Sequence, residues 1–254
     1  LHDGRDKVTR VVIVSNVDTA LLVMGLDHDF SVRRLERFVA LARMAQVEPV
    51  VVLTKADLCA DAAVRLAEVQ QSVPGADVRA VNALDADAGS ALADWLLPGR
   101  TLVLVGSSGA GKSTLTNTLA AAEVACTGAN RTGDSRGRHT TTTRSLHTTP
   151  SGACIIDTPG LRTLRLDGDA DQLGTVFEDI AQLALSCRFR DCLHDSEPGC
   201  AVRDAVSPER LANYRKLLRE ARRDSITALE RKAIVQKWKV RSRAGRERAQ
   251  AKRG

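Results

Sequence analysis

Gly106-Ser-Ser-Gly-Ala-Gly-Lys-Ser113 is the stretch that decides the fold of this chain, because it matches the phosphate-binding pattern G-x-x-x-x-G-K-[ST] at every fixed position. It follows an apolar run at residues 101–105 that predicts a buried strand, and it opens an apolar helix. In such a loop backbone N–H groups surround phosphate oxygens, Lys112 reaches the β- and γ-phosphates, and Ser113 ligates Mg²⁺. The alternative is a Gly/Ser turn that only begins a helix, and the agreement of strand, loop and helix disfavours it.

A second motif, Thr54-Lys-Ala-Asp57, follows the most hydrophobic strand pattern in the chain. The Asp57 carboxylate can accept hydrogen bonds from guanine N1–H and N2–H₂, a donor pair that adenine lacks, and the stem of Lys55 can cover the base. Thr54 stands where Asn is usual, so an oxygen is kept and an amide donor is lost. Asn82-Ala83, after another predicted strand, is a candidate backbone contact to guanine O6. Asp57 therefore favours GTP over ATP.

Asp157-Thr-Pro-Gly160 ends a predicted strand and supplies two groups that phosphoryl transfer needs, a carboxylate for Mg²⁺ and a glycine N–H for the γ-phosphate. One predicted helix and one long loop separate it from Lys112, so it completes the set. Many GTPases place a glutamine directly after this motif to orient the attacking water. This chain has Leu161 there, which cannot hydrogen-bond water. We expect slow hydrolysis without assistance.

Residues 127–143 are rich in glycine, arginine and threonine and predict a long exposed loop, a kind of loop that is usually functional. His139 within it is a candidate for the group that acts on the attacking water, with a solvated histidine among arginines as the alternative. One hydroxyl of Thr140–Thr143 is expected to complete the Mg²⁺ shell, and spacing does not choose among the four.

The base-reading motif precedes the phosphate loop, whereas an ordinary small GTPase meets the two in the opposite order. Predicted strands alternate with predicted helices along the first part of the chain, which indicates an open, mostly parallel α/β sheet with helices on both faces. Ligands bind such sheets at the carboxyl ends of the strands, and both motifs directly follow a strand. The predicted strands are residues 11–15, 49–53, 77–81, 101–105 and 152–156, and the predicted helices between them are 31–45, 60–71 and 90–96.

Cys187, Cys192, His194 and Cys200 lie close together in the sequence and offer three thiolates and one imidazole. Four such ligands close the tetrahedral shell that is typical of structural zinc. A coincidence of buried cysteines is the alternative, and the polar, turn-forming sequence around Pro198-Gly199 disfavours it. We therefore expect one structural Zn²⁺.

Charge is distributed unevenly. Residues 215–254 hold 15 Lys and Arg against 4 Asp and Glu, a net charge of +11. Because the whole chain has a net charge of +6, residues 1–214 have a net charge of −5. RNA is a natural partner for such a tail, and a solvated basic helix is the alternative. The chain is 43% apolar and 27% charged, which is typical of a soluble globular protein, and no apolar run approaches the ~20 residues of a membrane span. Without a signal-peptide pattern, we expect a cytoplasmic protein.

With these motifs in this order, and with Gly137-Arg-His-Thr-Thr-Thr142 between them, the chain resembles the circularly permuted GTPases of the ribosome small-subunit-dependent GTPase A (RsgA) family over nearly all of residues 10–254. The resemblance implies GTP hydrolysis stimulated by the 30S subunit, contact with 16S rRNA and a role late in that subunit's maturation. It also favours His139 as catalytic and Thr141 as the Mg²⁺ ligand. Family members usually carry an N-terminal OB-fold, which we expect to be almost wholly absent from this chain, with material missing upstream of Leu1.

The expected organisation is a remnant or linker at residues 1–9, a circularly permuted GTPase domain at 10–170, a helical zinc-binding domain at 171–239, and a basic tail at 240–254 that is disordered until it meets rRNA. We expect a monomer without membrane contact. Two alternatives stay open: a nucleotide-gated, zinc-containing RNA-binding scaffold with negligible turnover, and a P-loop kinase or ATPase, which Asp57 disfavours. The expected GTP-binding residues are Thr54, Lys55, Ala56, Asp57, Asn82, Ala83, Gly106, Ser107, Ser108, Gly109, Ala110, Gly111, Lys112, Ser113, Thr114, Thr141, Asp157 and Gly160. The expected catalytic residues are Lys112 and His139, and the expected Mg²⁺ ligands are Ser113, Thr141 and Asp157.

Overall fold

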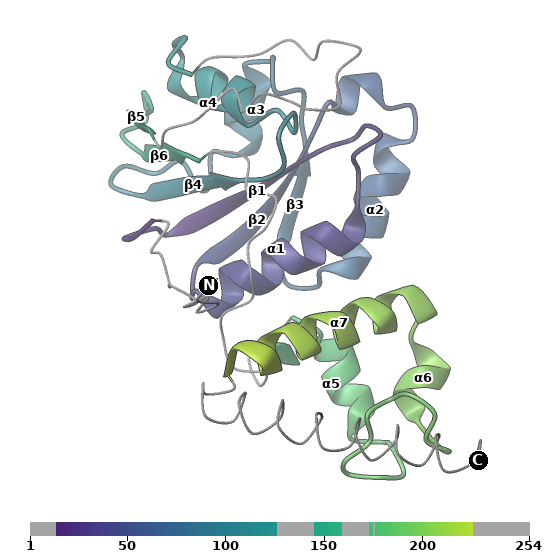
Figure 1. Ribbon diagram of the computed structural model, residues 1–254. Helices are drawn as coiled ribbons and strands as arrows, with labels where there is room; N and C mark the ends of the chain where they lie inside the picture. The colour runs from purple at the N-terminus through teal and green to yellow at the C-terminus, as the bar shows by residue number, and fades with distance from the viewer. Residues whose placement is uncertain (1–13, 126–144, 159–172, 175, 226–254) are drawn as a thin grey trace, which may run out of the picture. The chain divides into compact units, whose positions relative to one another are not determined.

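The structure is a computed structural model that describes residues 14–125, 145–158, 173–174 and 176–225, with side chains up to residue 221 (Figure 1). The chain divides into two compact units, residues 1–164 and 165–254. We describe each unit by itself. Within the described residues, no helix combines the length and the apolar character that crossing a membrane requires.

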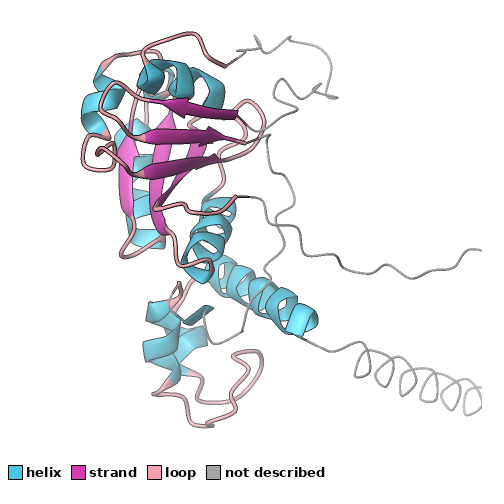
Figure 2. Ribbon diagram, turned by 90° about the vertical axis from the view of Figure 1, so that its left-hand side faces the viewer, coloured by secondary structure: helices cyan, strands magenta, loops and turns pink. Residues whose placement is uncertain are grey.

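A six-stranded sheet in the order β3-β2-β1-β4-β6-β5 forms the centre of the first unit (Figure 2). The edge strand β5 (Ser145–Thr148) pairs antiparallel with β6, and the other neighbouring strands pair in parallel. Parallel neighbours need crossover connections, which helices provide. The five parallel strands are β1 (Thr19–Gly25), β2 (Glu48–Thr54), β3 (Asp77–Ala80), β4 (Thr101–Val105) and β6 (Cys154–Asp157).

Both faces of this sheet are covered, as the sequence predicts. Leu21 and Val23 of β1 belong to a core cluster that includes Leu115 of α4, while the alternate residues Leu22 and Met24 are also fully buried. Because successive strand residues point to opposite faces, a fully buried strand needs cover on both sides. The described helices of this unit are α1 (Val32–Met44), α2 (Ala62–Ser72), α3 (Asp87–Ala91) and α4 (Lys112–Ala120), with a short 3₁₀ turn at Ala56–Leu58.

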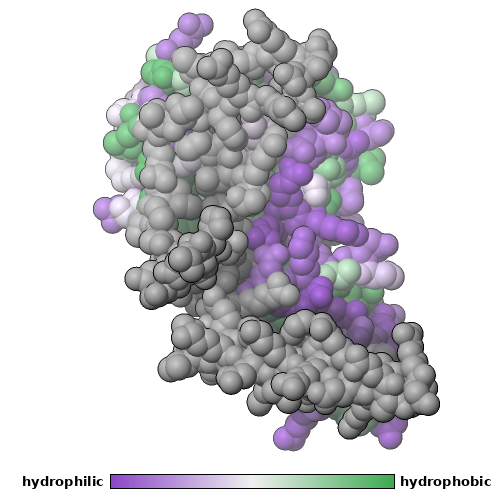
Figure 3. Space-filling view, in the orientation of Figure 1, coloured by the Kyte–Doolittle hydropathy of each residue, from purple (hydrophilic) through white to green (hydrophobic). Residues whose placement is uncertain are grey.

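Helix α1 is amphipathic. Its buried residues include Leu35, Phe38 and Val39, which recur at the spacing of one helical face. Basic residues occupy the opposite side, and hydrophilic residues gather in the region of α1 in the space-filling view (Figure 3). The apolar face contacts β1 and β2, so α1 fixes the position of the loop that precedes it.

The strand predicted at residues 11–15 is wrong, because the first strand of the sheet lies further along the chain. Residues 14 and 15 lie outside any strand, 11–13 fall outside the described part, and Asn16 has a left-handed φ of 54°. The strand is β1, which is buried at all seven positions. Its sequence, Thr-Ala-Leu-Leu-Val-Met-Gly, is rich in good helix formers, and burial between β2 and β4 overrides that preference.

Two further elements differ from prediction. The helix predicted at 90–96 is the shorter and earlier α3, and turns follow it to residue 95. Strand β5 was not predicted, because its four edge residues, which alternate between half-buried and exposed, carry little hydrophobic signal. The predicted long loop at 127–143 falls outside the described residues.

The second unit contains α5 (Glu178–Ala184), α6 (Ala201–Ala205) and α7 (Pro208–Ser225). Arg210 of α7 forms two 2.9 Å hydrogen bonds to the Asp179 carboxylate and lies over the Phe177 ring. The Phe177 ring also meets Tyr214 edge-on at 5.2 Å. These contacts join α7 to the start of α5. Residues 226–254 fall outside the described part of the chain.

Candidate nucleotide site

The phosphate loop connects the end of β4 to the start of α4, and its glycines are required by geometry. A Cβ added at Gly106 would lie 2.3 Å from the Val23 carbonyl oxygen of β1, so no larger residue fits without a shift. Gly111, the N-cap of α4, has a left-handed φ of 92°, a conformation that side chains disfavour. The loop therefore packs tightly on the sheet and leads into a helix N-terminus, where backbone N–H groups favour anions.

Lys112 is buried beneath this loop with 7% of its surface exposed. Its ammonium donates to the carbonyl oxygens of Gly106, at 3.0 Å, and Ser107, at 2.8 Å. An ammonium has three donors, so these two contacts among the described residues leave one donor for a ligand. Burial lowers the pKa of Lys112, and the nearby Asp157 carboxylate opposes that effect.

Asp157, at the end of β6, is the least satisfied charged group of the site. It is fully buried, opposite Leu104 of β4, and neither carboxylate oxygen has a hydrogen-bond partner among the described residues. Burial raises its pKa, and the Lys112 ammonium opposes the rise. The nearby Ser113 hydroxyl also lowers the pKa of Asp157, although neither carboxylate oxygen of Asp157 forms a full hydrogen bond. A buried carboxylate beside a hydroxyl is a ligand set that Mg²⁺ fits.

The base-reading motif is fastened to the phosphate loop by two side chains. The Thr54 hydroxyl donates to the Ala110 carbonyl at 2.6 Å, so threonine supplies a donor at this contact in place of the usual Asn. Lys55, with a left-handed φ of 59°, donates to the Gly109 carbonyl at 2.8 Å and pairs with Asp27 at 2.6 Å. The two motifs, separated by about fifty residues of chain, therefore lie side by side.

Asp57 is exposed at the 3₁₀ turn, and its carboxylate makes no hydrogen bond or ion pair within the described part of the chain. The loop after β3 lies next to it, since the Ala56 N–H donates to the Val81 carbonyl at 3.4 Å. The same loop is tied to α4 by the Thr118 hydroxyl, which donates to the Ala83 carbonyl at 2.6 Å. Asn82 and Ala83 thus follow β3 as predicted, beside the tetrad.

Sequence reasoning missed the acidic loop after β1. Asp27 holds Lys55, and the Asp29 carboxylate accepts a hydrogen bond from the Ser107 hydroxyl at 2.7 Å. The hydrogen bond from Arg34 is the main cause that lowers the pKa of Asp29. Burial raises the pKa of Asp27, but the hydrogen bond from Lys55 helps to bring that pKa below its ordinary value. No motif contains these residues. The signal for them is the sheet order, which places the loop after β1 between the two motifs.

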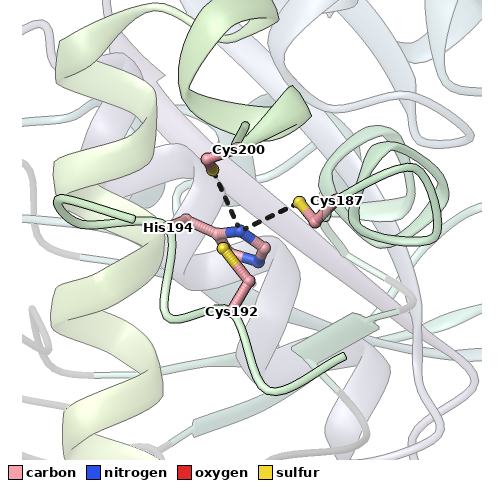
Figure 4. A group of neighbouring side chains, drawn as sticks. All are labelled: Cys187, Cys192, His194 and Cys200. Atoms are coloured by element: carbon pink, nitrogen blue, oxygen red, sulfur yellow. Dashed lines mark hydrogen bonds between the residues drawn. The ribbon is translucent and has the colours of Figure 1, made fainter. Parts of the chain in front are cut away.

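The four candidate metal ligands of the second unit converge (Figure 4). The ligand atoms of Cys187, Cys192, His194 and Cys200 all lie within 4.8 Å of one another. His194 Nδ1 lies 3.6 Å from Cys187 Sγ and 3.5 Å from Cys200 Sγ. Burial lowers the pKa of His194, which favours the neutral imidazole that binds metals.

Local structure supports this cluster. Cys200 is the N-cap of α6, and its sulfur accepts the Arg203 N–H at 3.4 Å. The Glu197 carboxylate accepts backbone N–H groups from Leu193 and Asp195, at 3.0 and 2.8 Å. His194, between those two residues, has a left-handed φ of 58°. The loop is therefore shaped by its own hydrogen bonds around the histidine.

The remaining predicted site residues fall partly inside and partly outside the described part of the chain. Ser108 and Thr114 are half-buried in the phosphate loop and the first turn of α4. Thr158, next to Asp157, donates to the Leu104 carbonyl at 2.6 Å and fixes the start of the Asp-Thr-Pro-Gly segment. His139, Thr141, Gly160 and Leu161 lie outside the described residues.

The fold and site define a P-loop nucleotide-binding domain with its strands in circularly permuted order. The sequence profile of the family described as RsgA GTPase matches residues 3–167. Small ribosomal subunit biogenesis GTPase RsgA of Xylella fastidiosa (strain 9a5c) is 54% identical over 212 residues, which cover 81% of this chain and 62% of that protein. The chain belongs to the RsgA GTPase family.

Other relatives agree. Small ribosomal subunit biogenesis GTPase RsgA 2 of Vibrio vulnificus (strain CMCP6) is 48% identical over 231 residues, covering 89% of this chain and 66% of that protein. The crystal structure of YjeQ from Thermotoga maritima matches with a TM-score of 0.60 at 28% identity, over 81% of this chain and 72% of that one. The structure of YloQ, described as a circularly permuted GTPase, matches with a TM-score of 0.59 at 28% identity, over 84% and 70%. The chain spans less than two thirds of the length of these two curated relatives.

Proposed function

We propose that this chain binds GTP with Mg²⁺ and hydrolyses it to GDP and phosphate, and that it does so in a late step of small ribosomal subunit maturation. The observation that carries the proposal is the Asp157 carboxylate, which is fully buried beside Lys112 and lacks a hydrogen-bond partner among the described residues. An unsatisfied buried charge is costly, so such a group persists where a ligand needs it. The family to which the chain belongs supports the same activity.

In this proposal, one group of residues binds the guanine base and another binds the phosphates and Mg²⁺. Asp57 would accept the two guanine donors, and the Ala83 N–H would approach guanine O6. The backbone of Gly106–Ser113 would surround the β-phosphate, with the third donor of Lys112 directed at the β- and γ-oxygens. Ser113 and Asp157 would hold Mg²⁺, which neutralises charge on these phosphates when bound. Thr141 and Gly160 are proposed to complete this set on sequence grounds.

Attack by water is the step for which this chain is poorly equipped. Leu161 stands where a water-orienting glutamine is common, so we propose intrinsic turnover near the ~10⁻⁴ s⁻¹ of unassisted GTPases. We propose His139 as the residue that orients the water once the ribosomal subunit is bound. His139→Ala should then abolish subunit-stimulated turnover and leave GTP binding unchanged. Normal stimulated turnover in that variant would remove His139 from the mechanism.

The partner that we propose is the 30S subunit, contacted through 16S rRNA. The names of the relatives, which are small ribosomal subunit biogenesis GTPases, support it. The basic segment at residues 215–254 supplies the charge that phosphate binding needs. Deleting residues 240–254 should weaken subunit binding, with a smaller salt dependence than in the intact chain. We further propose a cytoplasmic monomer, in keeping with the location of ribosome assembly.

We propose one structural Zn²⁺ in the second unit, held by the three cysteines and His194. Three sulfurs and one imidazole nitrogen within 4.8 Å of one another match a tetrahedral zinc shell. The backbone N–H that Arg203 donates to the Cys200 sulfur, at 3.4 Å, fixes the position of that ligand atom. Such a shell has no open position for a substrate, so its role is to hold the loop together.

The decisive experiment compares GTP turnover by the purified chain alone, with 30S subunits and with 50S subunits. We expect slow turnover alone, strong stimulation by 30S and little by 50S. Equal turnover in all three conditions would refute the ribosomal part of the proposal. Failure to bind GTP at all would refute the whole.

A second candidate is a nucleotide-gated, zinc-containing RNA-binding scaffold with negligible turnover, which Leu161 favours. Single-turnover hydrolysis with saturating 30S subunits separates the two, because a scaffold leaves GTP intact on the timescale at which an enzyme converts it. A P-loop kinase or ATPase is the third candidate. Competition of ATP against GTP for the site decides it, since Asp57 should make GTP bind far more tightly.

A further inference from the structure

Two side chains outside the recognised motifs, Asp29 and Arg34, contact Ser107 in the first turn of the phosphate loop. The Ser107 hydroxyl donates to the Asp29 carboxylate at 2.7 Å, from the loop between β1 and α1. Arg34, in the first turn of α1, contacts both oxygens of the same carboxylate at 2.5 and 3.1 Å. It also lies 3.3 Å from the Ser107 hydroxyl. We call this set, Asp29, Arg34 and Ser107, the loop clamp.

The loop clamp contacts the buried Lys112 ammonium directly, through the backbone of Ser107. Ser107 uses its hydroxyl to contact Asp29, while its backbone carbonyl accepts a hydrogen bond from Lys112 at 2.8 Å. Ser107 and Lys112 are 6% and 7% exposed, so both are held in packed surroundings. A change in the position of Ser107 therefore displaces one of the two carbonyls that orient Lys112.

The Asp29–Arg34 pair affects the orientation of the Asp29 carboxylate more than the free energy of unfolding. The two side chains are 42% and 34% exposed, and an ion pair this accessible contributes little to the free energy of unfolding. The arginine fork, however, fixes the direction of the carboxylate through two parallel contacts. That direction decides whether Asp29 meets the Ser107 hydroxyl.

We infer that the loop clamp positions the phosphate loop for binding GTP and GDP, with Asp29 and Arg34 as positioning residues that act through Ser107 and Lys112. Neither residue needs to touch the nucleotide. The inference rests on the proposed function, because it adds supporting residues to the same nucleotide site. It also explains why an acidic side chain sits beside an anion-binding loop: the arginine neutralises its charge.

The test uses two variants that keep the net charge. Ser107→Ala removes the hydroxyl alone, and Asp29→Asn with Arg34→Gln removes both charges together. The single Asp29→Asn change is avoided, because the freed Arg34 guanidinium would attract phosphates and mask the loss. Each variant should bind GDP and GTP about 10-fold more weakly, a change of about 1.4 kcal/mol. The triple variant should be no weaker than either, because both changes break the same contact.

Arg34→Lys is the conservative variant. It is compared with Arg34→Gln, each made with Asp29 intact. Lysine keeps the positive charge but loses the two parallel donors of the guanidinium, so Arg34→Lys should bind nucleotide more tightly than Arg34→Gln and more weakly than wild type. The matched control for charge is Asp94→Asn with Arg33→Gln, two exposed positions outside the loop clamp, and it should leave affinity unchanged.

Dissociation constants are measured by competition against a fluorescent GDP analogue, together with the preference for GDP over ADP and the thermal midpoint without nucleotide. A positioning role predicts weaker phosphate binding with the guanine preference intact and the midpoint within about 2 °C of wild type. Affinities within 2-fold of wild type in both variants would overturn the inference, as would losses that add in the triple variant. A wild-type chain that fails to bind GDP and GTP would instead overturn the proposed function.

Discussion

Replacing Gly106 by alanine should damage both the sheet and the nucleotide site. The added Cβ would lie 2.3 Å from the Val23 carbonyl oxygen, about 1 Å inside normal contact, and 3.5 Å from the Val23 Cβ. Val23 belongs to β1, which is buried at every position and paired on both sides, so it cannot move away freely. The phosphate loop must shift instead, and the loop carries a carbonyl that orients Lys112.

Overpacking of this kind costs about 1–3 kcal/mol. Because the contact is with backbone in the centre of a sheet, we expect the upper half of that range, a fall of about 4–12 °C in the thermal midpoint for a chain of this size. GDP affinity should fall at least 10-fold, since the loop gives way before β1. The assays are thermal unfolding followed by circular dichroism and binding of a fluorescent GDP analogue.

Gly89→Ala is the matched control. Gly89 lies in α3, and an added Cβ there has no neighbour within 4 Å. Alanine in an open helical position should raise stability by about 0.4–1 kcal/mol and leave GDP binding unchanged. If Gly106→Ala unfolded and bound GDP like wild type, the claim that β1 and the phosphate loop are in rigid contact would be wrong.

Three further outcomes follow from the two units. Asp57→Asn should shift preference from guanine to xanthine nucleotides, measured by competition, and unchanged guanine preference would remove Asp57 from base recognition. Chelation of metal, or Cys192→Ser, should unfold the second unit while GDP binding persists, and a metal assay that finds no zinc in native protein would contradict this. Arg210→Gln should destabilise the second unit at neutral pH, because the Asp179 pKa is lowered in the folded state, where burial is outweighed by the Arg210 hydrogen bonds. That contribution is present above about pH 4, the unfolded value of an aspartate, and is lost as pH falls through the folded pKa, so the variant and wild type should converge in acid-induced unfolding.

The phosphate loop could be predicted from sequence because its geometry depends on residue types at fixed spacing. Gly106 and Gly111 are needed where a Cβ would strike β1 or where the backbone is left-handed. The strand before the loop is likewise defined by an unbroken apolar run, and the predicted span 101–105 is the observed β4. Local chemistry decides such features, so one sequence suffices.

Contacts that depend on the order of the strands in the sheet could not be predicted from the sequence. The composition of β1 favours a helix, and only its place between β2 and β4 makes it a strand. Asp29 and Arg34 carry no motif, and their contact with Ser107 spans more than seventy positions of chain. Such contacts depend on which strands become neighbours, and a periodicity of apolar residues does not encode that.

The position of β1 also bears on how the domain assembles during synthesis. Its pairing with β2 joins residues such as Leu21 and Val50, whereas its pairing with β4 joins Thr19 to Leu102, a much longer loop closure. Nearby contacts form sooner because they lose less chain entropy. We therefore expect β1, β2 and β3 to associate on the ribosome before β4 has emerged, so that the base-reading half is formed while the protein still lacks a place for phosphate. A nascent chain stalled after about residue 90, once clear of the exit tunnel, would accordingly lack β4 and the phosphate loop and be unable to retain GDP.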